Sequence, residues 1–309
     1  MKKIKFPKLP KLPKLPKQTS LRLTYEIGIA FFILLVMLVF VYGLGIYKYN
    51  WTRYGTKTIT KFIPYPAAFV GPLWISMSQF NYQKDFILHF YDKTGTPLDN
   101  EREIDREIMD RIIEQKLVER EFKKQGLFVS QKEIDDEYKK IVEENQGEEN
   151  VKKMLDDLYG MKPADLKRLI KDRLVIEKFK NEVLVSAHVA HILTKDQNRA
   201  NDILAKLKAG ENWDDLAKNF SEDENSRDKG GDLGFLQRGS LVSGKPMSKE
   251  FEQGVFSLNV GQISPSPVAT EFGYHIFKVT EKKGKIDKSY EDWLAEAKSK
   301  TWIKKFIGK

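Results

Sequence analysis

The sequence predicts an α+β protein that is held at a membrane by an N-terminal transmembrane helix. Three observations support this prediction. An uncharged apolar stretch, Ile27 to Tyr47, comes near the start of the chain. Helical periodicity then runs through roughly 80–185. Beyond Val185 a strand, helices, a glycine loop and a closing strand follow within about a hundred residues, which is typical of a compact α+β domain.

The apolar stretch "IGIAFFILLVMLVFVYGLGIY" contains 21 residues and no charge. At about 1.5 Å per residue it covers the ~30 Å of hydrocarbon in a bilayer. Aromatic residues that favour the membrane interface cluster at its ends, namely Tyr25, Tyr42, Tyr47, Trp51 and Tyr54. A cleaved signal peptide is the alternative, but it normally has a shorter apolar region and a small-residue cleavage site, and "YGLGIYKYN" is a poor one. An uncleaved single span is therefore the favoured prediction.

The charge distribution predicts the orientation of this span. The formal net charge is +9, and eight basic residues with no acid precede Glu26. The positive-inside bias favours a cytoplasmic N-terminus and places the remaining domains outside a bacterial plasma membrane. Beyond the basic tail, acidic and basic side chains are interspersed, so no nucleic-acid partner is predicted. The Lys-Leu-Pro repeat "PKLPKLPKLPK" favours polyproline II; its lysines either meet anionic lipids or belong to a plain spacer.

The segment between the anchor and Val185 carries helix signals but no recognisable ligand or catalytic set. Apolar residues recur at helical spacing from Ile104 to Phe122, and Gly126 is a plausible stop. "SQKE" at 130–133 is a capping box that starts the next helix. Gly160 and Pro163 mark the boundary before a further long helix. The residues alone predict a scaffold or a protein-binding surface.

The acidic loop "SEDENSRDKGGDLGFLQRG" starts at Ser221 and is the most distinctive part of the mixed domain. Glycine clusters often hold phosphates, but here the neighbouring acids would repel one and no Lys-Ser or Lys-Thr follows Gly234. A nucleotide site is thus excluded, and a surface turn is the plain alternative. The chain has no cysteine, which also excludes disulfides, thiolate metal sites and a cysteine nucleophile.

Six blocks in order give this domain a resemblance to a known family. They are "AHIL" at 190–193, "FSEDENS" at 220–226, "GGDLGF" at 230–235, "FEQGVFSL" at 251–258, "GQIS" at 261–264 and "FGYHIFKV" at 272–279. Together they resemble the parvulin family of peptidyl-prolyl cis-trans isomerases. The resemblance implies a small antiparallel sheet and an enzyme that needs no cofactor and no metal.

The resemblance also implies which residues form the site. Asp223, His191 and His275 would make a polar catalytic network. The substrate pocket would be apolar, formed by Leu233, Leu236, Met247, Phe251 and Phe272. Two alternatives remain for these residues: Met247 and Phe251 as an ordinary core pair on a helix, and the two histidines as a satisfied structural pair. A metal site that adds His188 is disfavoured, because His188 and His191 alternate to opposite faces of a strand.

The helical segment is similar to the chaperone part of bacterial extracytoplasmic foldases of the PrsA and SurA type. The expected organisation is a basic cytoplasmic tail (1–24), a transmembrane helix (25–47), a juxtamembrane segment (48–79), an all-α chaperone-like domain (80–185), a parvulin domain (186–282) and a C-terminal helix (288–309). The implied function is a membrane-anchored isomerase and foldase for unfolded secreted polypeptides that contain X-Pro bonds. A non-catalytic holdase that uses the parvulin fold only to bind peptides is the alternative.

The last segment, Tyr290 to Ile307, has an amphipathic pattern rich in aromatic residues and is predicted to be a helix. The membrane surface, the parvulin sheet and the helical domain are its three possible partners. Acidic residues among its lysines weaken the first, and the resemblance places the end of the parvulin domain near Val279. In the foldases that the chain resembles, segments on both sides of the isomerase build the chaperone part. We therefore expect this tail to return to the helical domain.

Overall fold

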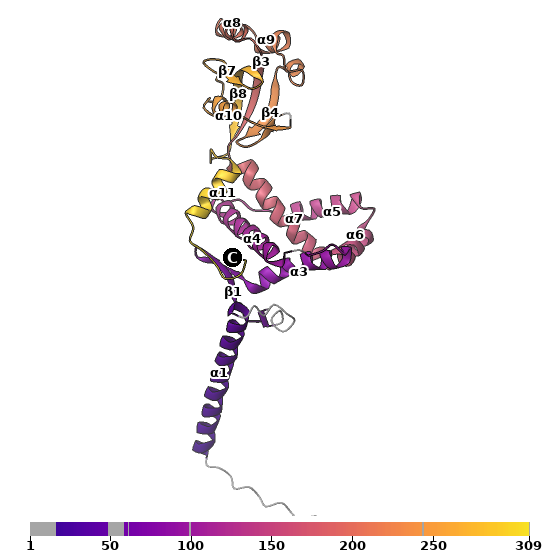
Figure 1. Ribbon diagram of the computed structural model, residues 1–309, viewed down its shortest axis with the longest axis vertical. Coiled ribbons are helices and arrows are strands. Elements are labelled where there is room, and N and C mark those ends of the chain that lie inside the picture. The colour runs from indigo at the N-terminus through magenta and orange to yellow at the C-terminus, as the bar shows by residue number, and fades with distance from the viewer. Residues whose placement is uncertain (1–16, 49–58, 61, 99, 243, 309) are drawn as a thin grey trace, which may run out of the picture.

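The computed structural model describes residues 17–48, 59–60, 62–98, 100–242 and 244–308. The Lys-Leu-Pro repeat, Trp51 and Tyr54 lie outside the described residues. A long helix stands at one end of the molecule, a mostly helical domain lies in the middle, and a domain built on a four-stranded sheet stands at the other end (Figure 1). The protein is therefore of mixed α and β class.

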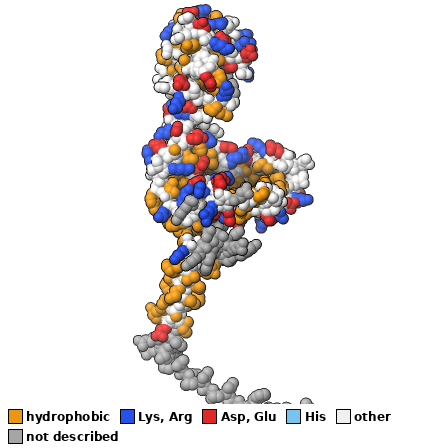
Figure 2. Space-filling model, viewed as in Figure 1, with side chains coloured by type: hydrophobic (Ala, Val, Ile, Leu, Met, Phe, Trp, Pro, Cys, Tyr) orange, Lys and Arg blue, Asp and Glu red, His pale blue; other side chains and the backbone are white. Residues whose placement is uncertain are grey.

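The N-terminal helix α1 (Lys17–Lys48) contains the predicted span. Its segment Tyr25–Lys48 is long and apolar enough to cross a membrane. The most apolar 18-residue window of this segment has a mean hydropathy of 2.8 and is not buried inside the fold. Hydrophobic side chains cover this helix outside the folded part (Figure 2). By length and composition such a helix fits either an anchor or a signal sequence.

Between residues 77 and 178, the described part of the helical domain contains α3 (Met77–Thr94), α4 (Glu101–Lys124), α5 (Gln131–Glu144), α6 (Glu148–Met154) and α7 (Pro163–Lys178). Short π-helical turns, η1 (Leu155–Tyr159) and η2 (Phe179–Val183), extend α6 and α7. The capping box at Ser130 and Glu133 is present, and Gly160 ends η1 in the left-handed conformation. Pro163 starts α7, where its fixed φ is already helical.

A small antiparallel sheet, which sequence periodicity did not indicate, joins α1 to this domain. Its order is β2 (Leu73–Ser76), β1 (Pro66–Val70), β9 (Ile303–Lys305). The strand β9 corrects the prediction of a helix through Ile307, because α11 covers only Tyr290–Ser299. The physical reason is strand pairing. The three residues of β9 lie opposite Ala68, Phe69 and Val70 in an antiparallel ladder, which satisfies the backbone of β9 as a strand.

The C-terminal segment packs against the helical domain. Trp293 of α11 is 7% exposed, and its ring centroid lies 4.4 Å from that of Phe179. The Tyr290 hydroxyl donates to Glu114 of α4 at 2.7 Å. The same hydrophobic core also includes residues of α1, of β1 and of α4. Segments from both ends of the described chain therefore share one core.

The remaining domain has an antiparallel sheet in the order β4 (Asp232–Gln237), β3 (Ser186–Thr194), β8 (Gly273–Lys283), β7 (Val268–Thr270). Helices α8 (Gln197–Lys208) and α9 (Trp213–Phe220) share a core with Ala190, Ile192 and Ile276 on one face. Helix α10 (Lys249–Phe256) covers the other face over Val189, Phe277 and Val279. A short ribbon, β5 (Leu241–Val242) with β6 (Lys245–Pro246), precedes α10.

Candidate active site

Two buried histidines lie side by side at the centre of the four-stranded sheet. His191 is on β3 and His275 on β8, and they are 3% and 2% exposed. His275 pairs with Leu193, so His191 lies diagonally across from it on the face that α10 covers. The two Nδ1 atoms are 3.0 Å apart, which is hydrogen-bond distance.

The acidic loop brings Asp223 to this pair. An Asp223 carboxylate oxygen lies 2.8 Å from His191 Nε2, and the Ser226 hydroxyl donates to the same oxygen. The loop is held to β3 by the backbone N–H of Glu222, which donates to the Leu193 carbonyl at 2.7 Å. Gly231 has a φ of +76°, and a Cβ there would lie 1.9 Å from the His191 carbonyl oxygen. The glycine is therefore required for the loop to cross β3 so closely.

The hydrogen bonds can be assigned as one directed chain when both imidazoles are neutral. A carboxylate only accepts, so His191 donates from Nε2 to Asp223 and presents a bare Nδ1. His275 then donates from Nδ1 to His191, and its bare Nε2 accepts from the Thr270 hydroxyl, 2.8 Å away. Every ring nitrogen is satisfied, and Asp223 fixes the tautomer of both rings.

The surroundings of His275 and Asp223 hold these two side chains in defined charge states. Burial, reinforced by the neighbouring His191, lowers the pKa of His275 to about 3, so its ring is neutral near pH 7. The hydrogen bond from His191, together with bonds from Ser226 and the Asn225 backbone, outweighs burial and holds the pKa of Asp223 below its usual range. The site therefore combines a fixed carboxylate with an uncharged imidazole.

A pocket of about 250 Å³ opens above this network. Its polar side is formed by His191, Asp223 and His275, and its apolar walls include Met247, Phe251 and Phe272. The Phe251 ring lies edge-on to the His275 ring at 5.3 Å. Lys245 stands over the Phe272 ring at 4.8 Å and closes one side. The structure thus brings six of the eight predicted site residues around one cavity.

The other two predicted residues, Leu233 and Leu236, are not among the residues that line this pocket. Leu236 is 6% exposed and lies opposite Ala187, in the core under α10, and Leu233 packs against the same core. This core also contains Phe251, one of the pocket walls.

Sequence reasoning missed several lining residues. Val242, Lys245 and Pro246 come from the β5–β6 ribbon, to which the sequence analysis assigned no role. Leu193 and Thr270 also line the pocket, as do Asn225 and Ser248. His188 does not join the other histidines, because its Nδ1 bonds the Thr280 hydroxyl at 2.8 Å. Within the described ranges, no group of three or more His, Asp or Glu residues could hold a metal ion.

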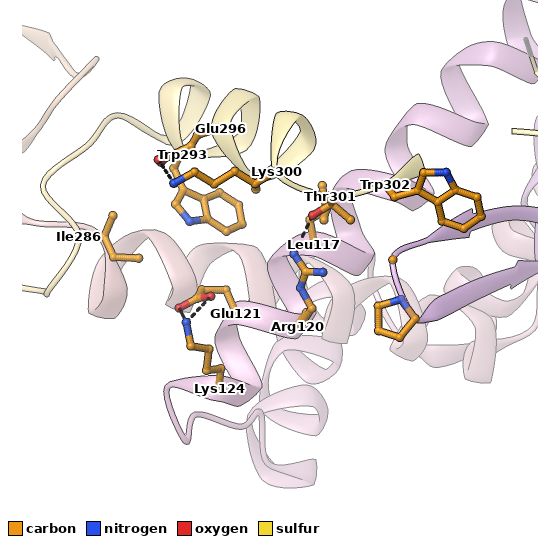
Figure 3. A pocket seen from close by; sticks show the side chains of 13 residues that line it. Leu117, Arg120, Glu121, Lys124, Ile286, Trp293, Glu296, Lys300, Thr301 and Trp302 are labelled. Carbon is orange, nitrogen blue, oxygen red and sulfur yellow. Dashed lines mark hydrogen bonds and ion pairs between the residues drawn. The ribbon is translucent and has the colours of Figure 1, made fainter. Parts of the chain in front are cut away.

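A second, larger cleft of about 520 Å³ lies in the helical domain between α4 and α11 (Figure 3). Trp293 and Leu117 form its apolar floor, and Arg120 donates to the Thr301 hydroxyl at 3.0 Å across one end. Charged pairs such as Lys300 with Glu296 flank it.

The low pKa of His275 predicts a pH dependence of stability. Its folded value of about 3 lies below the ordinary value of about 6.5, so the unfolded chain takes up the proton first. The contribution of the neutral ring is complete above about pH 6.5 and is lost as the pH falls toward 3. We expect His275→Asn to make the loss of stability between pH 7 and pH 5 shallower, as measured by hydrogen exchange of β3 and β8 amides in urea. His188→Asn is the control, and equal slopes in the two variants would contradict the assignment.

Comparisons with known proteins agree with this geometry. The family described as the SurA-like N-terminal domain matches residues 20–182, more than half of the chain, and the PPIC-type PPIASE domain matches residues 167–283. Foldase protein PrsA 2 of Bacillus cereus is 41% identical over 155 residues, which cover 49% of this chain and 50% of that protein. Foldase protein PrsA of Geobacillus kaustophilus is 32% identical over 203 residues, which cover 62% of this chain and 67% of that protein.

A solved structure is also similar in sequence. It is the peptidylprolyl isomerase PrsA from Bacillus anthracis, 30% identical, with 62% of this chain and 86% of that chain covered and a TM-score of 0.31. The chain spans about half of the B. cereus relative's length and two thirds of the G. kaustophilus one. The chain therefore belongs to the family that joins a SurA-like N-terminal domain to a PPIC-type PPIase domain, the family of the PrsA foldases.

Proposed function

We propose that this protein is a membrane-anchored, extracytoplasmic peptidyl-prolyl cis-trans isomerase and foldase that acts on secreted polypeptides. The main support for this proposal is the pocket in the isomerase domain. Three apolar residues of its wall face a buried hydrogen-bonded network; the wall residues are Met247, Phe251 and Phe272, and the network consists of Asp223, His191 and His275. The PPIC-type domain and the PrsA relatives support the same activity.

The reaction needs only groups that this pocket supplies. Isomerisation of an X-Pro bond makes and breaks no covalent bond, and its barrier of roughly 18–20 kcal/mol is the loss of amide resonance. The apolar walls of Met247, Phe251 and Phe272 hold the proline ring and exclude water. The neutral His275 presents an uncharged ring to the pocket beside these apolar walls. Binding the twisted amide better than the planar one lowers the barrier, and each ~1.4 kcal/mol gives tenfold in rate.

The direct test is a proline-peptide isomerisation assay on the full chain in detergent. We expect a rate constant that rises linearly with protein concentration above the uncatalysed exchange. A chain that is folded by circular dichroism but gives no acceleration would refute the enzymatic proposal.

The second candidate function is a holdase that binds unfolded chains without catalysis. It is favoured by one observation, the cleft floored by Trp293 and Leu117, which is larger than the pocket in the isomerase domain. If only this function exists, Met247→Ala will leave suppression of client aggregation unchanged and no isomerase activity will be measurable in either protein.

The proposed assembly has two functional units on one anchor. Residues 1–24 form the cytoplasmic tail and 25–47 the span. The chaperone unit combines 80–185 with the C-terminal segment 288–309 and extends into the juxtamembrane segment 48–79 through β1 and β2. Residues 186–282 form the isomerase unit. The clients are unfolded or partly folded secreted polypeptides.

The anchor predicts a protease-protection result. Protease added to intact spheroplasts is expected to remove essentially all of the isomerase domain and to leave a short fragment that includes the basic tail, because the positive-inside bias keeps this tail in the cytoplasm. Permeabilised spheroplasts, in which the tail is also digested, are the control. Recovery of a mature protein that begins after Tyr47 would instead show a cleaved signal sequence.

A further inference from the structure

The three-stranded sheet beside α1 has an aromatic outer face. Phe69 pairs with Trp74 on one side and with Lys304 on the other, so the three side chains project from the same face. The Phe69 ring stacks on Trp302 at 6.0 Å and meets Phe306 edge-on at 5.7 Å. We call these five residues the aromatic face.

This face is exposed although it is apolar. Trp74 is 50% exposed and Trp302 is 62% exposed, whereas Ala68, Val70 and Ile75 on the reverse side are fully buried in the core. Trp302 lies beside the β1–β2 hairpin, away from Trp293 (Figure 3). Lys304 is exposed and has no ion pair among the described residues. Adjacent exposed aromatic rings around one cation mark a binding surface.

The position of α1 indicates what this surface meets. The Tyr47 ring, near the end of α1, lies 5.5 Å from the Phe306 ring, and its hydroxyl donates to the Pro66 carbonyl at 2.8 Å. Tyr65 reaches further along α1, where its hydroxyl donates to the Val39 carbonyl at 2.6 Å. The sheet is thus fixed directly onto the helix (Figure 1).

Helix length sets the depth of these contacts. If the hydrocarbon begins near Ile27, about 20 residues cross it and Tyr47 lies at its outer boundary. Val39 then lies about 12 Å deeper than Tyr47, at 1.5 Å per residue. Because Tyr65 contacts Val39, the base of the folded domain reaches the level of the lipids. The rings next to Tyr47 must then lie close to the headgroups.

We propose that the aromatic face lies in the outer headgroup layer of the membrane, so that the lipid surface is its partner. The inference rests on the proposed anchor. Tryptophan and phenylalanine rings suit this layer, and the ammonium of Lys304 can meet lipid phosphates. The face is continuous with α1 through Phe306 and Tyr47, which favours lipid over a client segment or a second copy of the chain.

The absence of cysteine from the sequence permits a direct test with single spin labels. Lys304→Cys and Trp74→Cys place labels on the aromatic face. Phe128→Cys, at a site that is 73% exposed between α4 and α5, is the aqueous control, and Val36→Cys marks the middle of the proposed span. The full chain is placed in phosphatidylethanolamine–phosphatidylglycerol vesicles, and collisions with oxygen and with a water-soluble nickel complex are measured. We expect nickel accessibility at positions 304 and 74 to be at least about threefold lower than at position 128.

The possible outcomes test the membrane anchor and the lipid contact of the aromatic face separately. If the label at position 36 is not shielded from nickel, the anchor itself is wrong. If position 36 is shielded but positions 304 and 74 match position 128, only the lipid contact is wrong. Shielding of positions 304 and 74 that rises with the protein-to-lipid ratio of the vesicles would assign the face to a second copy of the chain and overturn the inference. If one of the two variants labelled on the aromatic face fails to fold, the other variant still tests the lipid contact.

Discussion

Trp293→Ala is expected to lower the free energy of unfolding of the helical domain by about 3–5 kcal/mol, the usual cost of truncating a buried aromatic side chain. The ring is 7% exposed and packs 4.4 Å from Phe179, in the core that also holds residues of α4. Its removal leaves a cavity between α11 and the rest of the domain. Thermal unfolding of the full chain in detergent, followed by circular dichroism, measures the effect.

Trp302→Ala is the matched control. This tryptophan comes from the same C-terminal segment but is 62% exposed, so its loss is expected to cost less than about 1.5 kcal/mol. A similar loss of unfolding free energy in both variants would mean that Trp293 does not hold the C-terminal segment to the helical domain.

Truncation after Asp287 extends this prediction. It removes Trp293, the strand β9 and the bond from Tyr290 to Glu114. We expect the helical domain to melt at a clearly lower temperature and to stop suppressing client aggregation, while isomerisation persists because the four-stranded sheet contains none of this segment. An unchanged melting temperature with intact client binding would contradict the shared core.

Met247→Ala is expected to reduce kcat/KM for a proline peptide about tenfold, equivalent to ~1.4 kcal/mol of transition-state binding. Met247 lines the pocket and is only partly buried, so its truncation removes substrate contact at little cost in folding. Coupled peptide assays give the rate, and the melting temperature checks that the domain is intact.

The choice of Met247 over Phe251 follows from burial. Both residues were expected to line the pocket, and Phe251 is 5% exposed and packs on Phe277 at 4.6 Å. Phe251→Ala would therefore destabilise the domain as well as empty the pocket. Val260→Ala, at a residue that is 57% exposed and outside the pocket, is the control for Met247→Ala. Equal activity of the two variants would argue against the pocket assignment.

The sequence by itself determined the local elements and the family. Periodicity and caps predicted α4, the capping box at Ser130 and the stop at Gly160 before Pro163, because each depends only on near neighbours along the chain. The ordered motifs indicated the parvulin resemblance and singled out Asp223, His191 and His275. The structure brings these three side chains together, and their catalytic role stays a prediction.

Only the tertiary structure decided where distant segments meet. Strand β9 has three residues, too few for an alternating pattern, and it forms because β1 offers it backbone partners from the other end of the chain. The same reason explains where Leu236 lies: whether its side chain faces a cavity or a core depends on its pairing with Ala187, not on its neighbours in sequence. Val242 and Lys245 likewise line the pocket only because the β5–β6 ribbon folds over it. Local chemistry specifies an element, but long-range backbone pairing and burial decide which of its side chains reach the site.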